Sequence, residues 1–234
     1  MLGARSNSAS PLSVIGGFCI WGLFIGLIIY YMIYMDKKRR QEFRDRCQRD
    51  RLNYIDEEEY IPKCKVVFDI TSRGYSHKYS VIVSGERNGI VFSTLDFYYN
   101  VGGKNGSRYR TLCVLSKPGV VFPDFYVRTE NTISDWIGEK LGGQDIDFDE
   151  DADFSGKFVL QGSDEKLIRS FFDQRVRKAF VAVHSNDYEF ESAGNYLLVS
   201  NRGILNYDER LKMLSNALTV FSSFMKDYDE GNLA

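Results

Sequence analysis

Histidine is nearly absent from this chain, which has only His77 and His184 among its 234 residues. Two histidines exclude a metal centre built from several imidazoles, and they leave a histidine-based catalytic triad with just two candidates. The sequence also lacks the glycine-rich signatures of nucleophile elbows, P-loops and dinucleotide-binding turns. We therefore predict that the protein is not an enzyme and holds no cofactor.

The acidic residues and the cysteines also lack the spacings of known metal-binding motifs. The acidic run 145–154 alternates carboxylates as a calcium loop does, but a loop that starts at Asp147 has Ala152 where the sharp turn needs glycine. Its twelfth position, which should be glutamate, is Phe158. An acidic surface loop is the favoured interpretation, and cation binding stays open. The four cysteines form no CxxC pair, so the sequence suggests neither a zinc site nor a disulfide framework. They are Cys19, Cys47, Cys64 and Cys113.

Charge is absent from one long stretch, the 23 residues from Ser13 to Met35. A helix of this length reaches roughly 34 Å, enough to cross the hydrocarbon core of a bilayer. No small-residue cleavage site follows it, and its tyrosine-rich end resembles an interfacial aromatic belt. We predict an uncleaved transmembrane helix at 13–35, preceded by a short non-cytoplasmic tail at 1–12.

Basic residues lie almost entirely on one side of this stretch. Only Arg5 precedes it, whereas four basic side chains follow at once: Lys37, Lys38, Arg39 and Arg40. The positive-inside rule then places the C-terminal side in the cytoplasm and the helix in the inner (plasma) membrane. The same four residues are candidates for binding anionic membrane lipid, although they could serve only as a topology signal on a solvated helix.

Two glycines four residues apart, Gly22 and Gly26, form a GxxxG motif within the span. Small residues at this spacing allow a second helix to approach closely, so we consider them a candidate contact with a transmembrane helix of another subunit. Glycine is also simply common in membrane helices, and that alternative remains open.

An acidic domain follows the basic segment. Residues 36–51 carry a net charge of +4, and residues 52–234 carry −7. An acidic surface disfavours nucleic acid as a partner because phosphate binding needs a positive face. We divide this part of the chain into a basic juxtamembrane helix with an acidic linker at 36–62 and a cytoplasmic domain at 63–234.

Hydrophobic patterning predicts an α+β fold with an antiparallel sheet for that domain. Short apolar runs separated by turn signals such as Asn88-Gly89 and Ala193-Gly194 predict strands at 64–71, 79–84, 90–99, 108–115, 124–130, 157–161, 188–191 and 196–200. Helical spacing predicts helices over 133–141, after Ser163, and over 208–228. The last opens with Asn206 and Glu209, a capping pair, and carries an apolar stripe of Leu211, Leu214, Leu218, Phe221 and Met225.

Three short motifs follow the membrane segment: Gly85 to Gly89 running into Phe97-Tyr98-Tyr99; Pro123, Phe125, Val127 and Glu130; and Asp153-Phe154, Gly156, Phe158, Gly162 and Asp164. With them the chain resembles a broad group of uncharacterised bacterial membrane-anchored proteins over roughly residues 80–220. The resemblance implies a fold and a bacterial origin, and it supplies no catalytic residue.

These observations favour a single-pass accessory or scaffold subunit of a membrane complex, whose cytoplasmic domain binds another protein. The alternative is a membrane-tethered ligand-binding sensor or hydrolase with a site built from scattered carboxylates, such as Glu130 and Asp153, and from tyrosines. A deep polar pocket would favour the alternative. A flat apolar patch on the domain would favour the scaffold.

Overall fold

The structure is a computed structural model that describes residues 11–56, 68–103, 106–130, 145–184 and 187–225, with backbone only over residues 11–20. The chain divides into two compact units, Met1–Asp45 and Arg46–Ala234.

The first unit is built on one long helix, α1 (Pro11–Arg49), whose last turn belongs to the second unit. The helix runs without a break through the uncharged stretch and the basic residues that follow it, as the absence of proline and glycine after Gly26 favours. Among the residues whose side chains are described, no helix carries an apolar run long enough to cross a bilayer. The first part of the expected span, residues 13–20, lies outside those residues.

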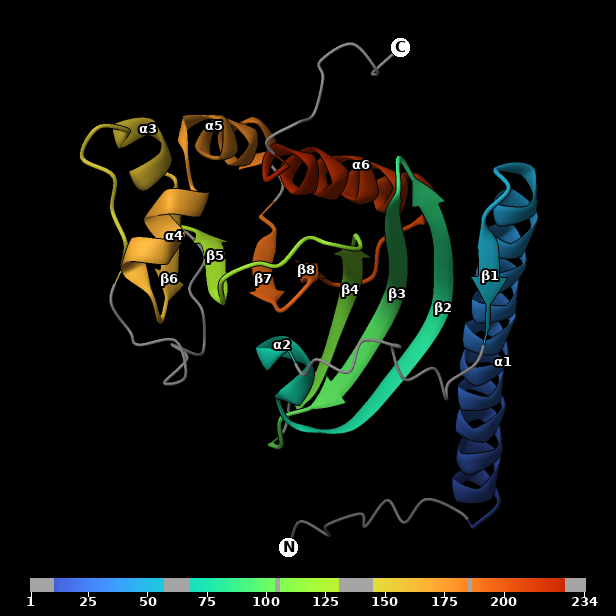
Figure 1. Ribbon diagram of the computed structural model, residues 1–234. Coiled ribbons are helices and arrows are strands. Elements are labelled where there is room, and N and C mark those ends of the chain that lie inside the picture. The colour runs from blue at the N-terminus through green and yellow to red at the C-terminus, as the bar shows by residue number, and fades with distance from the viewer. Residues whose placement is uncertain (1–10, 57–67, 104–105, 131–144, 185–186, 226–234) are drawn as a thin grey trace, which may run out of the picture. The chain divides into compact units, whose positions relative to one another are not determined.

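The second unit contains an eight-stranded antiparallel sheet in the order β1-β2-β3-β4-β8-β7-β5-β6 (Figure 1). The α+β prediction with an antiparallel sheet is therefore confirmed. Hairpin turns join β2 to β3 at Asn88-Gly89 and β7 to β8 at Gly194, where the predicted turn signals lie. The strands are β1 (Asn53–Ile55), β2 (Tyr75–Arg87), β3 (Ile90–Asn100), β4 (Ser107–Ser116), β5 (Phe125–Thr129), β6 (Phe158–Gly162), β7 (Glu189–Ala193) and β8 (Tyr196–Arg202).

Five helices are described in this unit: α2 (Asp69–Ser72), α3 (Ala152–Ser155), α4 (Glu165–Phe171), α5 (Gln174–Val183) and α6 (Tyr207–Ser223). The strand expected over 64–71 is wrong from residue 69 on, where α2 begins. The residues of the expected acidic linker that are described include β1, which pairs with β2. The helix expected over 133–141 lies outside the described residues.

Alternating side chains on the strands supply two separate apolar clusters, one on each face of the sheet. On β4 and β8, Cys113 and Leu197 belong to the larger cluster, whereas Leu112 and Leu198 belong to the smaller one. Helices α4, α5 and α6 cover the larger cluster. Phe68 and Ile70 of the α2 segment cover the smaller one, which we call the second cluster (Figure 1).

Helix α6 shows where the predicted stripe was only partly correct. The predicted capping box is present, since Asn206 and Glu209 each bond the other's backbone amide. Leu214 and Phe221 are buried, but Leu211 and Leu218 are only half-buried. The buried face is rotated toward Met213, Ala217, Val220 and the charged Arg210, and the helix ends at Ser223, earlier than expected.

Arg210 is buried beside an unusual strand residue. Its guanidinium pairs with Asp96 of β3 and donates to the Val81 carbonyl oxygen at 2.6 Å. Val81 lies at a register shift in β2 and has a φ of 50°, in the left-handed region that β-branched residues avoid. The hydrogen bond from Arg210 thus holds the carbonyl group of a residue with a strained backbone.

Candidate functional site

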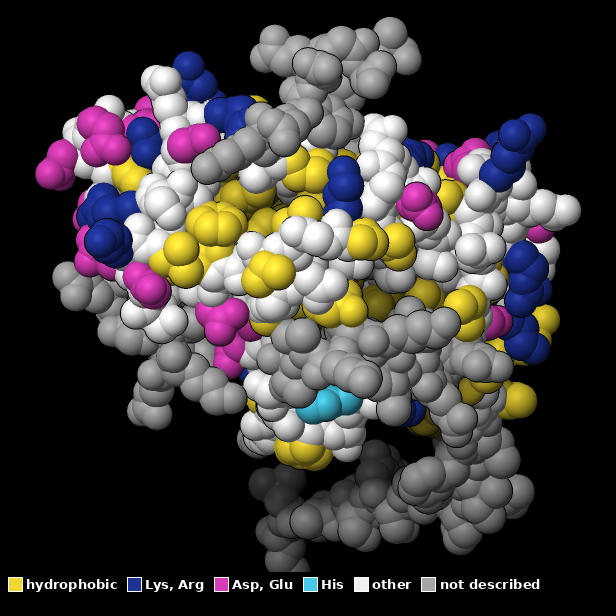
Figure 2. All heavy atoms as spheres, viewed as in Figure 1, with side chains coloured by type: hydrophobic (Ala, Val, Ile, Leu, Met, Phe, Trp, Pro, Cys, Tyr) yellow, Lys and Arg dark blue, Asp and Glu magenta, His cyan; other side chains and the backbone are white. Residues whose placement is uncertain are grey.

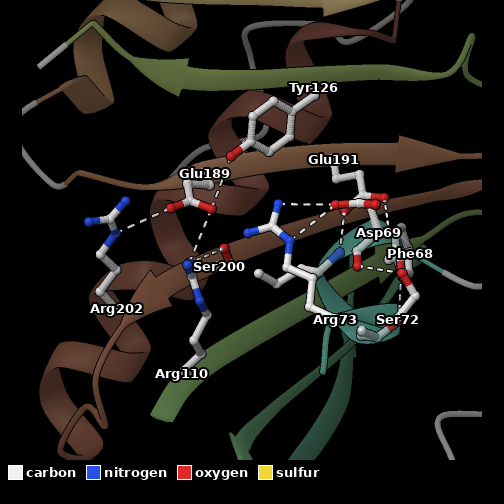
Figure 3. Close-up of polar contacts among 12 residues, drawn as sticks. Phe68, Asp69, Ser72, Arg73, Arg110, Tyr126, Glu189, Glu191, Ser200 and Arg202 are labelled. Atoms are coloured by element: carbon white, nitrogen blue, oxygen red, sulfur yellow. Dashed lines mark hydrogen bonds and ion pairs between the residues drawn. The ribbon is translucent and has the colours of Figure 1, made fainter. Parts of the chain in front are cut away.

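Ionisable side chains gather on the sheet face that carries α2, next to the second cluster (Figure 3). They come from α2 and from four strands, β4, β5, β7 and β8. Most of them are buried or half-buried. We call this group the carboxylate cluster; it consists of Asp69, Arg73, Arg110, Tyr126, Glu189, Glu191, Ser200 and Arg202.

Strand β7 places two glutamates in this cluster because side chains alternate along a strand. Glu189 and Glu191 face α2, whereas Phe190 between them packs into the larger cluster on the other face. The sequence pattern predicts a strand at 188–191, but the site that this strand helps to form was not predicted. The available signal was the alternation itself, since a buried hairpin strand with glutamate at every second position requires partners for both carboxylates.

Glu189 lies at the centre of an ion-pair network. Its carboxylate accepts the Tyr126 hydroxyl at 3.0 Å and meets the guanidinium groups of Arg110 at 3.1 Å and Arg202 at 3.3 Å. Burial by itself would raise the pKa of Glu189, but Arg110 and the other donors outweigh it, so the pKa lies below its ordinary value. Glu189 is therefore ionised and fully paired at neutral pH.

Glu191 has a different environment two residues along the same strand. Its carboxylate accepts the backbone N–H groups of Asp69 and Ile70, the latter at 3.3 Å, at the start of α2. Burial raises the pKa of Glu191 to about 7, against the opposing effect of the two amides. This carboxyl group consequently titrates in the neutral range.

The remaining members close the network. Arg73 pairs with Asp69 at 3.0 Å within α2 and its flank, and the Arg110 guanidinium also lies 3.4 Å from the Ser200 hydroxyl. Burial and Glu189 raise the pKa of Tyr126. Three carboxyl groups face three guanidinium groups, so the cluster is balanced in charge when Glu191 is ionised. Its chemistry is that of a structural ion-pair network with one carboxyl group that titrates near neutrality.

Hydrophobic side chains are exposed where β3 ends and β4 begins. Tyr75 is 58% exposed and Tyr109 is 55% exposed, and the rings of Tyr98 and Tyr109 lie 5.1 Å apart on paired strands. Val101, which directly follows β3, is 47% exposed. Figure 2 shows one small group of hydrophobic side chains at the lower end of the view and a larger hydrophobic area above it. We call Tyr75, Tyr98, Val101 and Tyr109 the tyrosine patch; tyrosine is enriched at protein interfaces.

The predicted residues of α1 are placed but not tested. A Cβ added at Gly22 or Gly26 would meet nothing within 4 Å. Lys37 and Lys38 are exposed. The Arg39 guanidinium stacks over the Phe43 ring at 4.8 Å, and Arg40 pairs with Asp36 at 2.8 Å. The helix–helix contact and the membrane-surface role of these residues stay predictions.

The carboxylates of the alternative hypothesis, Glu130 and Asp153, are both exposed. Each contacts Lys157: the Glu130 amide donates to its carbonyl oxygen at 2.8 Å, and Asp153 pairs with its ammonium group at 2.6 Å. In the acidic run, Asp151 caps α3 and pairs with Arg177 at 2.8 Å. Over the part of the chain that is described, no group of three or more metal-ligating side chains is assembled.

A cavity of about 190 Å³ lies between α4, α5 and the end of α6. Asp173, one of its polar residues, accepts the Val176 amide at 2.9 Å and so caps α5. None of its lining residues belongs to the carboxylate cluster; they are Ser170, Phe171, Asp173, Arg175, Val176 and Phe224. The described cavity therefore does not bring together the carboxylates of a hydrolytic site.

No family model matches the sequence, and no curated protein matches it. One solved structure that is similar is the crystal structure of the mycobacterial trehalose monomycolate transport factor A. The TM-score is 0.56 at 13% sequence identity, over 81% of this chain and 93% of that one. At this identity the likeness shows a shared fold, and it extends over nearly the whole of the other chain.

Proposed function

We propose that this protein is a single-pass membrane-anchored accessory subunit whose cytoplasmic domain binds another protein of a membrane complex. The observation that carries the proposal is the uncharged stretch 13–35, followed at once by Lys37 to Arg40 in one continuous helix. Such a helix delivers a folded domain to the inner face of a membrane.

The fold and the exposed surface support the proposal that the domain binds another protein of a membrane complex. A protein named as a transport factor has a similar fold, which suits an accessory role beside a transport system. The tyrosine patch offers exposed aromatic side chains at one end of the sheet, and its rings could bury apolar area and donate hydroxyl groups to a partner. Because the carboxylate cluster is paired internally, it offers a partner little by comparison.

The orientation can be tested with a reporter that is active only outside the cytoplasm, fused after Ala234. We expect no reporter activity, because the basic residues after Met35 hold the C-terminal side in the cytoplasm. Replacing Lys37, Lys38, Arg39 and Arg40 by Ser should raise reporter activity by weakening that signal. An active fusion of the unaltered chain would reverse the proposed topology.

Partner binding can be tested by extracting the full chain in mild detergent and identifying the proteins that co-purify. Tyr75→Ala with Tyr109→Ala should reduce the partner's recovery at least tenfold, because exposed aromatic side chains supply much of the energy of an interface. Val121→Ala, at a site 67% exposed, is the matched control and should leave recovery unchanged.

A second double variant in the same experiment distinguishes partner binding by the domain from partner binding by helix α1. Gly22→Leu with Gly26→Leu should lower recovery only where the partner also packs against α1 in the bilayer. Unchanged recovery in the double tyrosine variant, with its melting temperature preserved, would exclude the tyrosine patch as the docking surface.

A further inference from the structure

Helix α2 is a single turn whose helical state depends on the sheet. Four residues are far too few for a helix to be stable by itself in water. Phe68 and Ile70, only 1% and 2% exposed, pack on the second cluster. The sheet residues of that cluster come from β2, β3, β4 and β8; they include Ile82, Leu95, Phe97, Leu112 and Leu198.

One carboxylate joins the start of α2 to the sheet. The amides of Asp69 and Ile70 belong to the first turn, where backbone N–H groups have no partner within the helix, and both donate to Glu191. Figure 3 shows this carboxylate between the β7 backbone and α2. Glu189, on the same strand and face, bonds Arg110, Arg202 and Tyr126 instead.

The charged and titratable groups around Glu191 come from each element packed against it. Asp69 and Arg73 face it from α2 and its flank, Tyr126 lies opposite it on β5, and Glu189 precedes it on β7. The β8 residue opposite Glu191 is the apolar Leu198. Only the two amides of α2 donate directly to its carboxylate among these neighbours in the described chain.

We propose that α2 is a releasable strap, which Glu191 holds over the second cluster and which loosens when this carboxyl group ionises. Release of the strap uncovers apolar side chains of the sheet and returns Glu191 to water.

The direction of the pH effect on α2 docking depends on whether the closed or the released form binds the Glu191 proton more tightly. Burial raises the pKa of Glu191 to about 7 with the strap in place, above its ordinary value of 4.5. Once water reaches the carboxyl group, the pKa falls back toward that ordinary value. The closed form thus binds the proton more tightly, so docking is strongest below pH 4.5 and weakens as pH rises through about 7.

Hydrogen–deuterium exchange of the full chain in mild detergent tests the proposal. Protection of residues 68–73, corrected for the intrinsic exchange rate and compared with β4, should fall between pH 5 and pH 8. The largest possible change between these two pH values is about 70-fold, because each unit of pKa difference is a factor of ten and part of the total of about 300-fold falls below pH 5. Binding of the apolar dye anilinonaphthalene sulfonate should rise over the same range.

Two variants with the same change at neighbouring positions locate the effect. Glu191→Gln should show the same α2 protection at both pH values, because it has no carboxyl group to ionise. Glu189→Gln should retain the pH dependence of the unaltered chain. Equal protection of α2 at pH 5 and pH 8 in the unaltered chain overturns the proposal whether or not Glu191→Gln folds. The proposal is also overturned if Glu189→Gln loses the pH dependence of α2 protection while Glu191→Gln retains it.

Discussion

Replacing Arg210 by alanine should lower the free energy of unfolding by about 3–5 kcal/mol, because a buried carboxylate is then left without its partner. Arg210 is 2% exposed and pairs with Asp96, which is 6% exposed. The variant also removes the donor to the Val81 carbonyl oxygen. Chemical denaturation of the full chain in mild detergent measures the change.

A double variant separates the effect of the unpaired Asp96 carboxylate from the effect of losing the hydrogen bond to Val81. Arg210→Met with Asp96→Leu removes both charges and replaces them with apolar side chains, so the double variant should be more stable than Arg210→Ala. Arg202→Ala is the matched control, since this side chain is 51% exposed and its loss should cost far less. A loss below about 1 kcal/mol in Arg210→Ala would show that water reaches Asp96 in the folded protein.

The same residue shows why sequence analysis succeeded for the fold and failed for the site. The hairpins at Asn88 and Gly194, and the capping box at Asn206, depend on neighbours in sequence, and all three are present where predicted. The sequence around Arg210 does not distinguish a buried arginine from a solvated one on a helix. Its partner Asp96 is 114 residues away, so nothing local indicated the burial.

Helix α2 was missed for a related reason. The residues from Asp69 to Ser72 follow a β-branched run that is typical of a strand, and no local signal outweighs that pattern. The helix is present because Glu191, more than a hundred residues later, accepts its first amides, and because Phe68 and Ile70 have an apolar face to cover. Tertiary contacts outweighed propensity at this position.

The partners in the carboxylate cluster could not be assigned from the sequence, for the same reason as the Arg210 pair. Arg110, Tyr126 and Glu189 lie on strands that are separate in sequence, and the order β4-β8-β7-β5 brings them together. Hydrophobic periodicity identifies strands, but it does not give their order in the sheet. Once the order is known, the alternation along β7 assigns both glutamates to one face.

Replacing Phe180 by alanine should lower the free energy of unfolding by about 3–5 kcal/mol, since it leaves a cavity in the larger cluster. Phe180 on α5 is fully buried, and its ring lies 4.9 Å from Phe190 and 5.4 Å from Phe172, centre to centre. It also contacts Phe154 and Phe158, so one side chain joins α5 to α3, α4, β6 and β7. Thermal unfolding in mild detergent measures the loss.

Two matched controls follow: one changes the size of the side chain at position 180, and the other truncates an exposed side chain. Phe180→Leu should cost less than Phe180→Ala, because leucine refills most of the volume. Leu167→Ala on α4 should change stability by under about 0.5 kcal/mol, since that side chain is 42% exposed. If Phe180→Ala unfolds no earlier than Leu167→Ala, the helices α4, α5 and α6 do not share the single aromatic core on which this fold depends.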